Sequence, residues 1–310
     1  MTYEAVIAVL TFRRPDPLRS LLPELVKQAD AAPVSTGVFV IDNDPDGSAA
    51  DLVAEFAPQG VRYVNEKRPG IAAARNRALD ESPAERLLIF IDDDERPIDG
   101  WLGLMLGRYL TDRPTAVVGP VISEFDEMPD PWVRAGDFFR RRRLPTGTQI
   151  QVAATNNLLL DMTVINGWNL RFDEKFGISG GSDTLFTRAI VTRGGRMVWC
   201  DEAIVIDQVP ASRITRRWVL LRALRSGNGW SRVSLQLADS VGARMRLRLE
   251  LTGSGGVRAL GGSARYVVGF VTRSVVHRAK GLRTAARGVG MVSGAYGYVY
   301  QEYRRKRSPA

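Results

Sequence analysis

The chain has 310 residues, of which 45% are hydrophobic and 25% are charged, a composition typical of a globular protein. This composition excludes a chain that is mainly disordered or collagen-like, and the length allows one large domain or two of ordinary size. Cys200 is the single cysteine and His277 the single histidine. An intramolecular disulfide, a zinc site of several histidines and a histidine-centred triad elsewhere in the chain are therefore excluded.

Charge divides the chain near Pro210. Residues 1–210 hold 23 Lys and Arg against 31 Asp and Glu, a net charge of −8. Residues 211–310 hold 20 Lys and Arg against three acids, a net charge of +17. We therefore expect an acidic catalytic domain over residues 1–210 and a basic C-terminal region over residues 211–310 that faces an anionic surface.

Short apolar runs alternate with segments of helical periodicity along the first region. We expect strands at 3–10, 38–41, 61–64, 87–91 and 116–121, and helices at 17–28, 51–56, 71–79, 101–110 and 185–190. This alternation predicts an α/β fold with a parallel sheet that is covered on both faces.

Polar clusters follow three of these strands, at residues 11–13, 42–44 and 92–94. Because ligands of such sheets bind beyond the carboxyl ends of the strands, we expect the three clusters to converge on one edge. The cluster Asp92, Asp93 and Asp94 is the strongest chemical signal, since three adjacent carboxylates favour a hard divalent cation that shares phosphate oxygens. The alternative is a solvated turn in which an aspartate caps the next helix.

Four segments in order carry a family resemblance: VIAVLTFRRP, VFVIDNDPDGS, NEKRPGIAAARNRAL and LLIFIDDDERPIDGWL. They resemble the glycosyltransferases of family 2, which have the GT-A fold, and FDEKFGISGGSDTLFTRAIVTRGGRMVWCDEAIV resembles the second half of that fold. The whole set is similar to the bacterial exopolysaccharide subgroup of succinoglycan-type glucosyltransferases. The resemblance covers roughly residues 3–229 and implies a mostly parallel, Rossmann-like sheet flanked by helices, followed by a basic helical extension.

The resemblance implies roles for the residues at the strand ends. It implies a nucleotide-sugar site made by Thr11, Arg13, Asp42, Arg75, Asp92 and Asp93, and a Mn²⁺ or Mg²⁺ ion held by Asp94. In this scheme Asp42 accepts a hydrogen bond from the base, Asp93 holds the ribose and Arg75 contacts the base or the diphosphate. Each residue also has a plainer explanation, with Asp42 capping a turn and Arg75 as a surface arginine.

The catalytic base implied by the resemblance is Asp183, which would take the proton of the acceptor hydroxyl. Asp183 follows two glycines and precedes a helical run, so it is alternatively a helix cap. Two departures from the family pattern stand out. Ser182 replaces a frequent Glu, and the stretch DEAIVIDQVPASR lacks a distal histidine ligand. Either Asp207 replaces that histidine, or the metal relies on Asp94 and the phosphates.

The acceptor side is less defined. Asn156 and Asn157 are candidates for hydrogen bonds to sugar hydroxyls, and Trp168 and Trp132 for stacking on a sugar ring; core packing is the alternative for the aromatic residues. The run Arg140–Arg143 is either a loop over the donor phosphates or a solvated surface segment.

The C-terminal region combines basic and apolar residues. Segments 218–225 and 245–251 are amphipathic, residues 266–276 form an apolar run broken by Arg273, and the tail carries Arg304–Arg307. Such helices can lie in a lipid interface, where each Lys or Arg near anionic lipid adds about 1 kcal/mol. A helical subdomain with a charged exterior is the alternative, and nucleic-acid binding ranks last because no recognised motif appears.

We therefore expect an inverting glycosyltransferase that moves a hexose, with UDP-glucose as the first candidate donor, to a saccharide acceptor. The resemblance implies exopolysaccharide or cell-surface glycan synthesis and an acceptor linked to polyprenyl diphosphate. The N-terminal apolar run lacks a preceding basic segment, and no apolar stretch reaches the roughly 18 residues of a spanning helix, so we expect a cytoplasmic protein at the membrane surface. Two rivals remain, a non-catalytic scaffold and a sugar-phosphate nucleotidyltransferase, although TFRRPDP is not the glycine-rich loop that the latter usually has.

Overall fold

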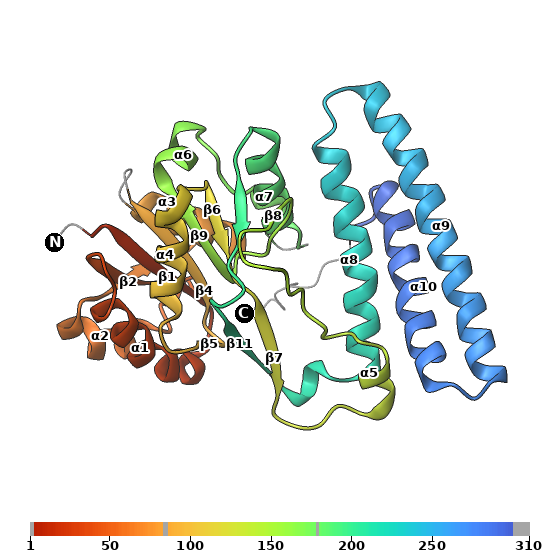
Figure 1. Ribbon diagram of the computed structural model, residues 1–310, viewed down its shortest axis with the longest axis horizontal. Coiled ribbons are helices and arrows are strands. Elements are labelled where there is room, and N and C mark those ends of the chain that lie inside the picture. The colour runs from red at the N-terminus through yellow and green to blue at the C-terminus, as the bar shows by residue number, and fades with distance from the viewer. Residues whose placement is uncertain (1–2, 83–85, 178–179, 300–310) are drawn as a thin grey trace. The chain divides into compact units, whose positions relative to one another are not determined.

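The computed structural model describes residues 3–82, 86–177 and 180–299 of the chain, which divides into two compact units (Figure 1). The first unit comprises residues 1–123, 141–177 and 182–208, and the second comprises residues 124–140, 178–181 and 209–310. The second unit thus includes, besides the whole basic C-terminal region, two short segments from the first two thirds of the chain.

An eight-stranded sheet forms the centre of the first unit, with the strand order β3-β2-β1-β4-β9-β6-β10-β8. Its strands are β1 (Ala5–Thr11), β2 (Thr36–Asp42), β3 (Val61–Asn65), β4 (Leu87–Asp92), β6 (Ala116–Val118), β8 (Gln149–Ile150), β9 (Asn157–Asp161) and β10 (Met197–Trp199). Strands β3, β2, β1 and β4 are parallel, whereas β9 runs antiparallel between β4 and β6. The four neighbouring strands that include those followed by the predicted polar clusters are therefore parallel, as the sequence predicted.

Helices cover both faces of this sheet because its strands are apolar on both sides. All seven residues of β1 are buried. Side chains of α1 (Pro15–Asp30), α2 (Ala50–Phe56) and α4 (Trp101–Asp112) pack in one hydrophobic cluster. Those of α3 (Ile71–Glu81), α6 (Met162–Gly167) and α7 (Ser182–Thr192) pack in the other cluster. Two short 3-10 helices lie in the connections of this unit: η1 (Ala57–Gln59) between α2 and β3, and η2 (Glu174–Phe176) between α6 and α7.

A second, three-stranded sheet has the order β5-β11-β7 and consists of β5 (Glu95–Pro97), β11 (Val205–Val209) and β7 (Val121–Phe125). The sequence predicted one strand over residues 116–121, but the chain leaves the large sheet at Gly119 and Pro120. A Cβ atom on Gly119 would lie 2.2 Å from the Ala203 carbonyl oxygen, so only glycine fits this crossing. Proline has no N–H for a sheet ladder, which also favours the break.

The second unit contains four helices in its described part: α5 (Pro131–Ala135), α8 (Arg216–Gln236), α9 (Val241–Val271) and α10 (Val275–Ala295), with a 3-10 turn η3 (Ala211–Arg213). The three long helices lie side by side in Figure 1, where α9 runs opposite to α8 and α10. Glycines make the contacts close. A Cβ atom on Gly262 of α9 would lie 2.7 Å from the Gly281 carbonyl oxygen of α10, and one on Gly290 of α10 would lie 1.9 Å from the Leu224 carbonyl oxygen of α8.

The apolar run predicted at 266–276 is in fact the end of α9 and the start of α10. Arg273, with a φ of 56°, lies in the turn between the two helices. Within the described residues, no helix is long and apolar enough to cross a membrane. The predicted basic tail Arg304–Arg307 lies outside the described residues.

Candidate active site

The register of the parallel strands brings the predicted polar clusters to one edge of the sheet. Thr11 at the end of β1 pairs with Asp42 at the end of β2, and Leu10 pairs with Asp92 at the end of β4. The Thr11 hydroxyl donates a hydrogen bond of 2.7 Å to Asp93. The carboxyl ends of three neighbouring strands thus present one continuous polar edge, as the alternation of strands and helices predicted.

Asp42 uses its carboxylate to hold the loop that follows β2. Its side chain is fully buried, one oxygen accepts from Asp44 N–H and the other from Ala49 N–H, both at 2.9 Å. The Tyr63 hydroxyl also donates to Asp42 at 3.0 Å, and burial, together with this carboxylate, raises the pKa of Tyr63 to about 12. Asp42 therefore acts as a cap of this turn, the alternative to a direct contact with a base, because its carboxylate accepts from two backbone N–H groups of the loop.

Arg13 pairs with the carboxylates of the same loop. Its Nε lies 2.9 Å from Asp44 and its Nη2 lies 2.8 Å from Asp46. The backbone of Arg13 has a φ of 55°, in the left-handed region that few non-glycine residues adopt. The ion pair with Arg13 lowers the pKa of Asp44, so this carboxylate is ionised at neutral pH. Arg13 therefore joins the ends of β1 and β2.

A dense set of acids continues the edge beyond β4. Burial raises the pKa of Asp92 to about 7, and the neighbouring Asp93, Asp94 and Asp207 contribute to the rise. Glu95 is buried, accepts a hydrogen bond of 2.5 Å from the Asn156 amide, and has its pKa raised well above the usual value by burial. Asp207 on β11 pairs directly with Glu95 on β5. Mutual repulsion and desolvation therefore both act on these carboxylates.

Two arginines partly neutralise this acidic edge. Arg14 Nη1 lies 2.7 Å from Asp94 and 3.2 Å from Asp93. Arg141, from the predicted run Arg140–Arg143, lies 2.6 Å from Asp207. Each arginine side chain is partly exposed, so either guanidinium has room to turn toward solvent.

The acidic edge offers oxygen donors for a divalent metal. Within residues 3–82, 86–177 and 180–299, no group of three or more His, Cys, Asp or Glu is arranged to hold an ion by protein ligands alone. The chemistry of the edge nevertheless fits, because its donors are carboxylate oxygens and because burial and three neighbouring acids disfavour the charged form of Asp92, which a cation would stabilise. Hard cations with few protein ligands complete their shell with water and substrate phosphates. The residues thus fit an ion that binds together with a diphosphate.

Arg75 connects α3 to the start of α7. The Arg75 side chain is buried, its Nη1 donates a 2.9 Å hydrogen bond to the Ser182 hydroxyl, and its guanidinium lies 5.4 Å from the centre of the Phe172 ring. Its charge also acts against the rise of the Asp92 pKa. Asp183 follows Ser182 in the first turn of α7, is half-buried, and accepts a 2.8 Å hydrogen bond from Thr184 N–H.

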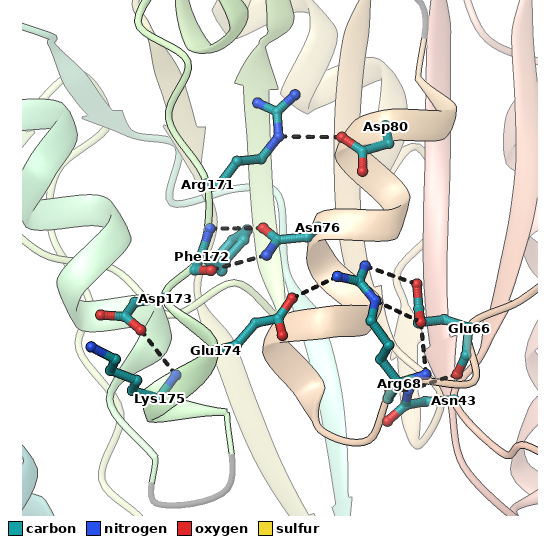
Figure 2. Close-up of polar contacts among 10 residues, drawn as sticks. All are labelled: Asn43, Glu66, Arg68, Asn76, Asp80, Arg171, Phe172, Asp173, Glu174 and Lys175. Carbon is teal, nitrogen blue, oxygen red and sulfur yellow. Dashed lines mark hydrogen bonds and ion pairs between the residues drawn. The ribbon is translucent and has the colours of Figure 1, made fainter.

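Figure 2 shows how α3 holds the segment that leads toward α7. The Asn76 amide brackets Phe172: its Nδ2 donates to the Phe172 carbonyl at 2.9 Å, and its Oδ1 accepts from Phe172 N–H at 2.8 Å. Arg171 adds an ion pair of 3.2 Å with Asp80, one turn further along α3. These contacts fix Phe172 beneath the Arg75 guanidinium.

The loop before α3 is tied in the same way (Figure 2). The Asn43 amide donates to the carbonyls of Glu66 and Arg68, at 2.9 and 2.6 Å, and accepts from Gly70 N–H. Arg68 pairs with Glu66 at 3.1 Å and reaches Glu174 at 3.0 Å. The polar cluster after β2 therefore organises the loop that opens α3.

The structure corrects the predicted sugar contacts at Asn157 and Trp168. Asn157 is 1% exposed, and its amide donates to the carbonyls of Pro120 and Ala203 and accepts from Trp101 Nε1–H, so it is a core residue. The Trp168 ring lies against Gly195, beyond the far end of α7 and about 14 Å along that helix from Asp183. Because β9 runs antiparallel, it carries the chain away from the ligand edge before Trp168.

Trp132 likewise belongs to a core. It packs within the second unit, stacked on Phe138 at 5.4 Å between ring centres, with the Arg216 guanidinium over its ring. Asn156, in contrast, lies at the acidic edge through its bond to Glu95. The residues that sequence reasoning missed are Arg14 and Glu95, although both stand inside the quoted motifs TFRRP and DDDERP.

Comparison with solved structures gives the fold. The chain is similar to the mannosyltransferase PcManGT from Pyrobaculum calidifontis in complex with GDP-Man and Mn²⁺, with a TM-score of 0.58 and 17% identity over 93% of this chain and 87% of that one. It is also similar to residues 1–349 of TarS from S. aureus, with a TM-score of 0.51 and 13% identity over 97% and 93% of the two chains. The predicted GT-A fold is confirmed.

Comparison of sequences gives the family. The succinoglycan biosynthesis protein ExoM of Rhizobium meliloti (strain 1021) is 32% identical over 251 residues, which are 80% of each chain. The profile of the family described as Glycosyl transferase family 2 matches residues 6–167, the part that carries β1, β2, β4 and the acidic triplet. The chain therefore belongs to glycosyltransferase family 2.

Proposed function

We propose that this enzyme transfers a hexose from a nucleoside-diphosphate sugar to a saccharide acceptor during the synthesis of an exopolysaccharide or cell-surface glycan. The observation that carries the proposal is the edge where Asp92, Asp93 and Asp94 follow β4, beside Thr11 and Asp42. The similarity to a succinoglycan biosynthesis protein supports the exopolysaccharide pathway.

The donor binds across the ends of β1, β2 and β4. UDP-glucose is the first candidate. Asp93, which accepts a hydrogen bond from the Thr11 hydroxyl, accepts a second one from the ribose in this proposal. Asp42 orients the loop that meets the base, because its carboxylate accepts from Asp44 N–H and Ala49 N–H. Arg13 and Arg14 stand at the same edge and supply positive charge for the phosphates.

A Mn²⁺ or Mg²⁺ ion held by Asp94, with Asp92 in support, would add positive charge beside the departing diphosphate. Asp207 is the residue of β11 that fits the place of a distal ligand, since it pairs with Glu95 and its backbone neighbour Gln208 donates to the Asp94 carbonyl at 3.4 Å. The Arg14 and Arg141 side chains would have to release Asp94 and Asp207 for both carboxylates to serve.

Transfer proceeds by direct displacement with inversion. The acceptor oxygen forms a bond to the anomeric carbon as the bond from that carbon to the diphosphate oxygen breaks, and the Asp183 carboxylate takes the proton of the acceptor hydroxyl. Asp183 lies half-buried in the first turn of α7, where one of its oxygens accepts a hydrogen bond from Thr184 N–H. Arg75 holds the adjacent Ser182 and thereby positions Asp183.

The acceptor is a saccharide linked to polyprenyl diphosphate, and the enzyme works at the cytoplasmic surface of the membrane. The basic composition of residues 211–310 supports this part, because both the lipid diphosphate and the lipid surface are anionic.

The test is hydrolysis of a panel of nucleotide sugars (UDP-glucose, UDP-galactose, UDP-N-acetylglucosamine and GDP-mannose) with Mn²⁺, with Mg²⁺ and with a chelator. Variants Asp94→Ala and Asp183→Asn are compared with Asp99→Ala, a control that removes an exposed carboxylate paired with the surface residue Lys27. One donor should turn over with metal, Asp94→Ala should abolish turnover, and Asp99→Ala should not change it.

Asp183→Asn separates binding from chemistry. It should keep the affinity for UDP, measured by calorimetry, and lose turnover. If neither UDP nor GDP binds, and no donor turns over, the proposed function is wrong. Turnover of one donor that survives the chelator would refute the metal, and a product of retained anomeric configuration would refute the displacement.

A further inference from the structure

The outer face of α9 is an exposed apolar surface. We define it by six large side chains that are between 50% and 76% exposed: Leu249, Val257, Leu260, Val267, Val268 and Val271. Their spacing of three, seven and eight residues puts them on one side of a helix. Added Cβ atoms on Gly253 and Gly256 would meet nothing within 4 Å, so this side of α9 is open.

The opposite side of α9 fixes how the helix is turned. Leu251, Gly255, Gly262 and Gly269 are its buried residues. A Cβ atom on Gly255 would lie 3.0 Å from the Gly288 carbonyl oxygen of α10, and one on Gly269 would lie 2.7 Å from His277 Cβ. Because the two backbones touch, α9 cannot rotate to bury its outer face without losing this packing. The packing of α9 on α10 therefore keeps the outer face exposed.

Charge indicates what covers this face. Residues 241–295, which span α9 and α10, contain ten Lys and Arg and one acid, Glu250. Arg258 and Arg265 are exposed on the side of α9 near α10, where the Arg265 Nε donates to His277 Nδ1 at 3.3 Å. A second copy would bring two helix pairs together that each carry ten basic residues against one acid, whereas an anionic lipid surface offers both an apolar layer and the opposite charge.

We propose that the outer face of α9 is the surface by which this enzyme lies on anionic lipid, with the helix along the membrane plane, the six apolar side chains in the acyl boundary and the arginines at the headgroups. The inference rests on the proposed function only in naming the membrane as the place of work. Lipid binding itself needs neither a donor nor an acceptor, so the two can fail separately.

The test is partition of the full-length protein to vesicles of phosphatidylcholine alone and of phosphatidylcholine mixed with phosphatidylglycerol, without nucleotide sugar. The test variant carries Val257→Gln, Leu260→Gln and Val267→Gln, and the matched control carries Leu110→Gln, Met128→Gln and Val289→Gln, which replace apolar side chains exposed elsewhere. We expect the wild type to prefer the anionic vesicles and the control to bind like the wild type. The test variant should bind these vesicles more weakly, by a factor of about ten or more.

A label reports the depth of the face directly. Cys200 is buried, so Leu260→Cys gives one accessible thiol for a fluorescent label, with Leu110→Cys as the control position. Lipid-bound quenchers should quench the label at 260 and leave that at 110 bright. The proposal is overturned if the wild type binds neither vesicle, if the test variant binds like the wild type, or if light scattering shows a dimer that only the test variant disrupts while vesicles have no effect.

Discussion

Arg14 Nη1 lies 2.7 Å from Asp94 Oδ2 and 3.2 Å from Asp93 Oδ1, although the arginine is about 80 residues away in the sequence. The guanidinium therefore occupies the oxygens that the family resemblance assigns to a ribose and a metal ion. Asp94 has its carboxylate partly exposed, and Arg14 approaches it from the loop that follows β1. A cation of the protein thus stands where a cation of the substrate complex is expected, and the two must compete.

We expect Arg14→Gln to bind Mn²⁺ about tenfold more tightly than the wild type in the absence of a donor, since the metal no longer has to displace a charged hydrogen-bond partner. Calorimetric titration with Mn²⁺ measures this. Arg19→Gln is the matched control, because Arg19 pairs with Glu55 on the exposed surface. Unchanged or weaker Mn²⁺ binding in Arg14→Gln would show that the two cations do not compete.

Arg75→Lys tests whether Arg75 positions the proposed base. Lysine keeps the charge but loses the planar group that reaches Ser182 while lying over Phe172. We expect kcat for transfer to fall by up to about a hundredfold, because a small displacement of a reacting group is that costly. The affinity for UDP should stay close to that of the wild type.

Arg77→Lys serves as the comparison for Arg75→Lys, since Arg77 lies two residues further on α3 and pairs with Glu81 one turn away. It should leave both kcat and UDP affinity unchanged. A loss of UDP affinity in Arg75→Lys with an unchanged kcat would instead assign Arg75 to the donor, as the resemblance implied.

The strands and helices that position the site could be predicted because their signals are local. The runs that became β1, β2 and β4 are apolar on both sides, and each ends in a polar cluster, so the ligand edge follows from the rule for parallel sheets. The direction of β9 could not be predicted in this way, because a short apolar run looks the same in a parallel and in an antiparallel strand. That one reversal moved Trp168 away from the site.

The partners of individual side chains also could not be predicted from the sequence. The pairing of Arg14 with Asp94 and of Arg141 with Asp207 depends on the tertiary fold, and neither sequence spacing nor composition reports it. The sequence predicted a sugar contact for Asn157, yet its amide forms hydrogen bonds with three buried partners: Trp101 Nε1–H and the carbonyls of Pro120 and Ala203. A buried amide and a ligand-binding amide have the same letter in the sequence, and only burial distinguishes them.

The loop after β2 should make stability depend on pH. The hydrogen bond from Arg13 lowers the pKa of Asp44 in the folded state, so the folded carboxyl binds a proton less readily than the unfolded one. The stabilisation is then complete above the unfolded pKa of about 3.9 and is lost as the pH falls through the lower folded value. We expect the difference in unfolding free energy between wild type and Asp44→Asn to be largest at neutral pH and to shrink in acid.

Urea unfolding at several pH values measures this difference. Asp46→Asn is the comparison, because Asp46 pairs with the same arginine from a position exposed to water, where ion pairs contribute little. Its effect should be small at every pH. A difference for Asp44→Asn that stays constant from neutral to acid pH would mean that the carboxylate's charge does not stabilise the loop.

Two adjacent glycines of α9 should respond to alanine with opposite signs. A Cβ atom on Gly262 would lie 2.4 Å from Ala285 N and 2.7 Å from the Gly281 carbonyl oxygen, both backbone atoms of α10, so the helices must separate. We expect Gly262→Ala to lower the free energy of unfolding by about 1–3 kcal/mol. A Cβ atom on Gly261 meets nothing within 4 Å, so Gly261→Ala should raise it by up to about 1 kcal/mol through helix propensity alone. Thermal unfolding, with amide hydrogen exchange read in α9 and α10, checks both values. Effects of the same sign would show that α9 does not pack on α10 through Gly262, and with that the fixed orientation of its outer face would be lost.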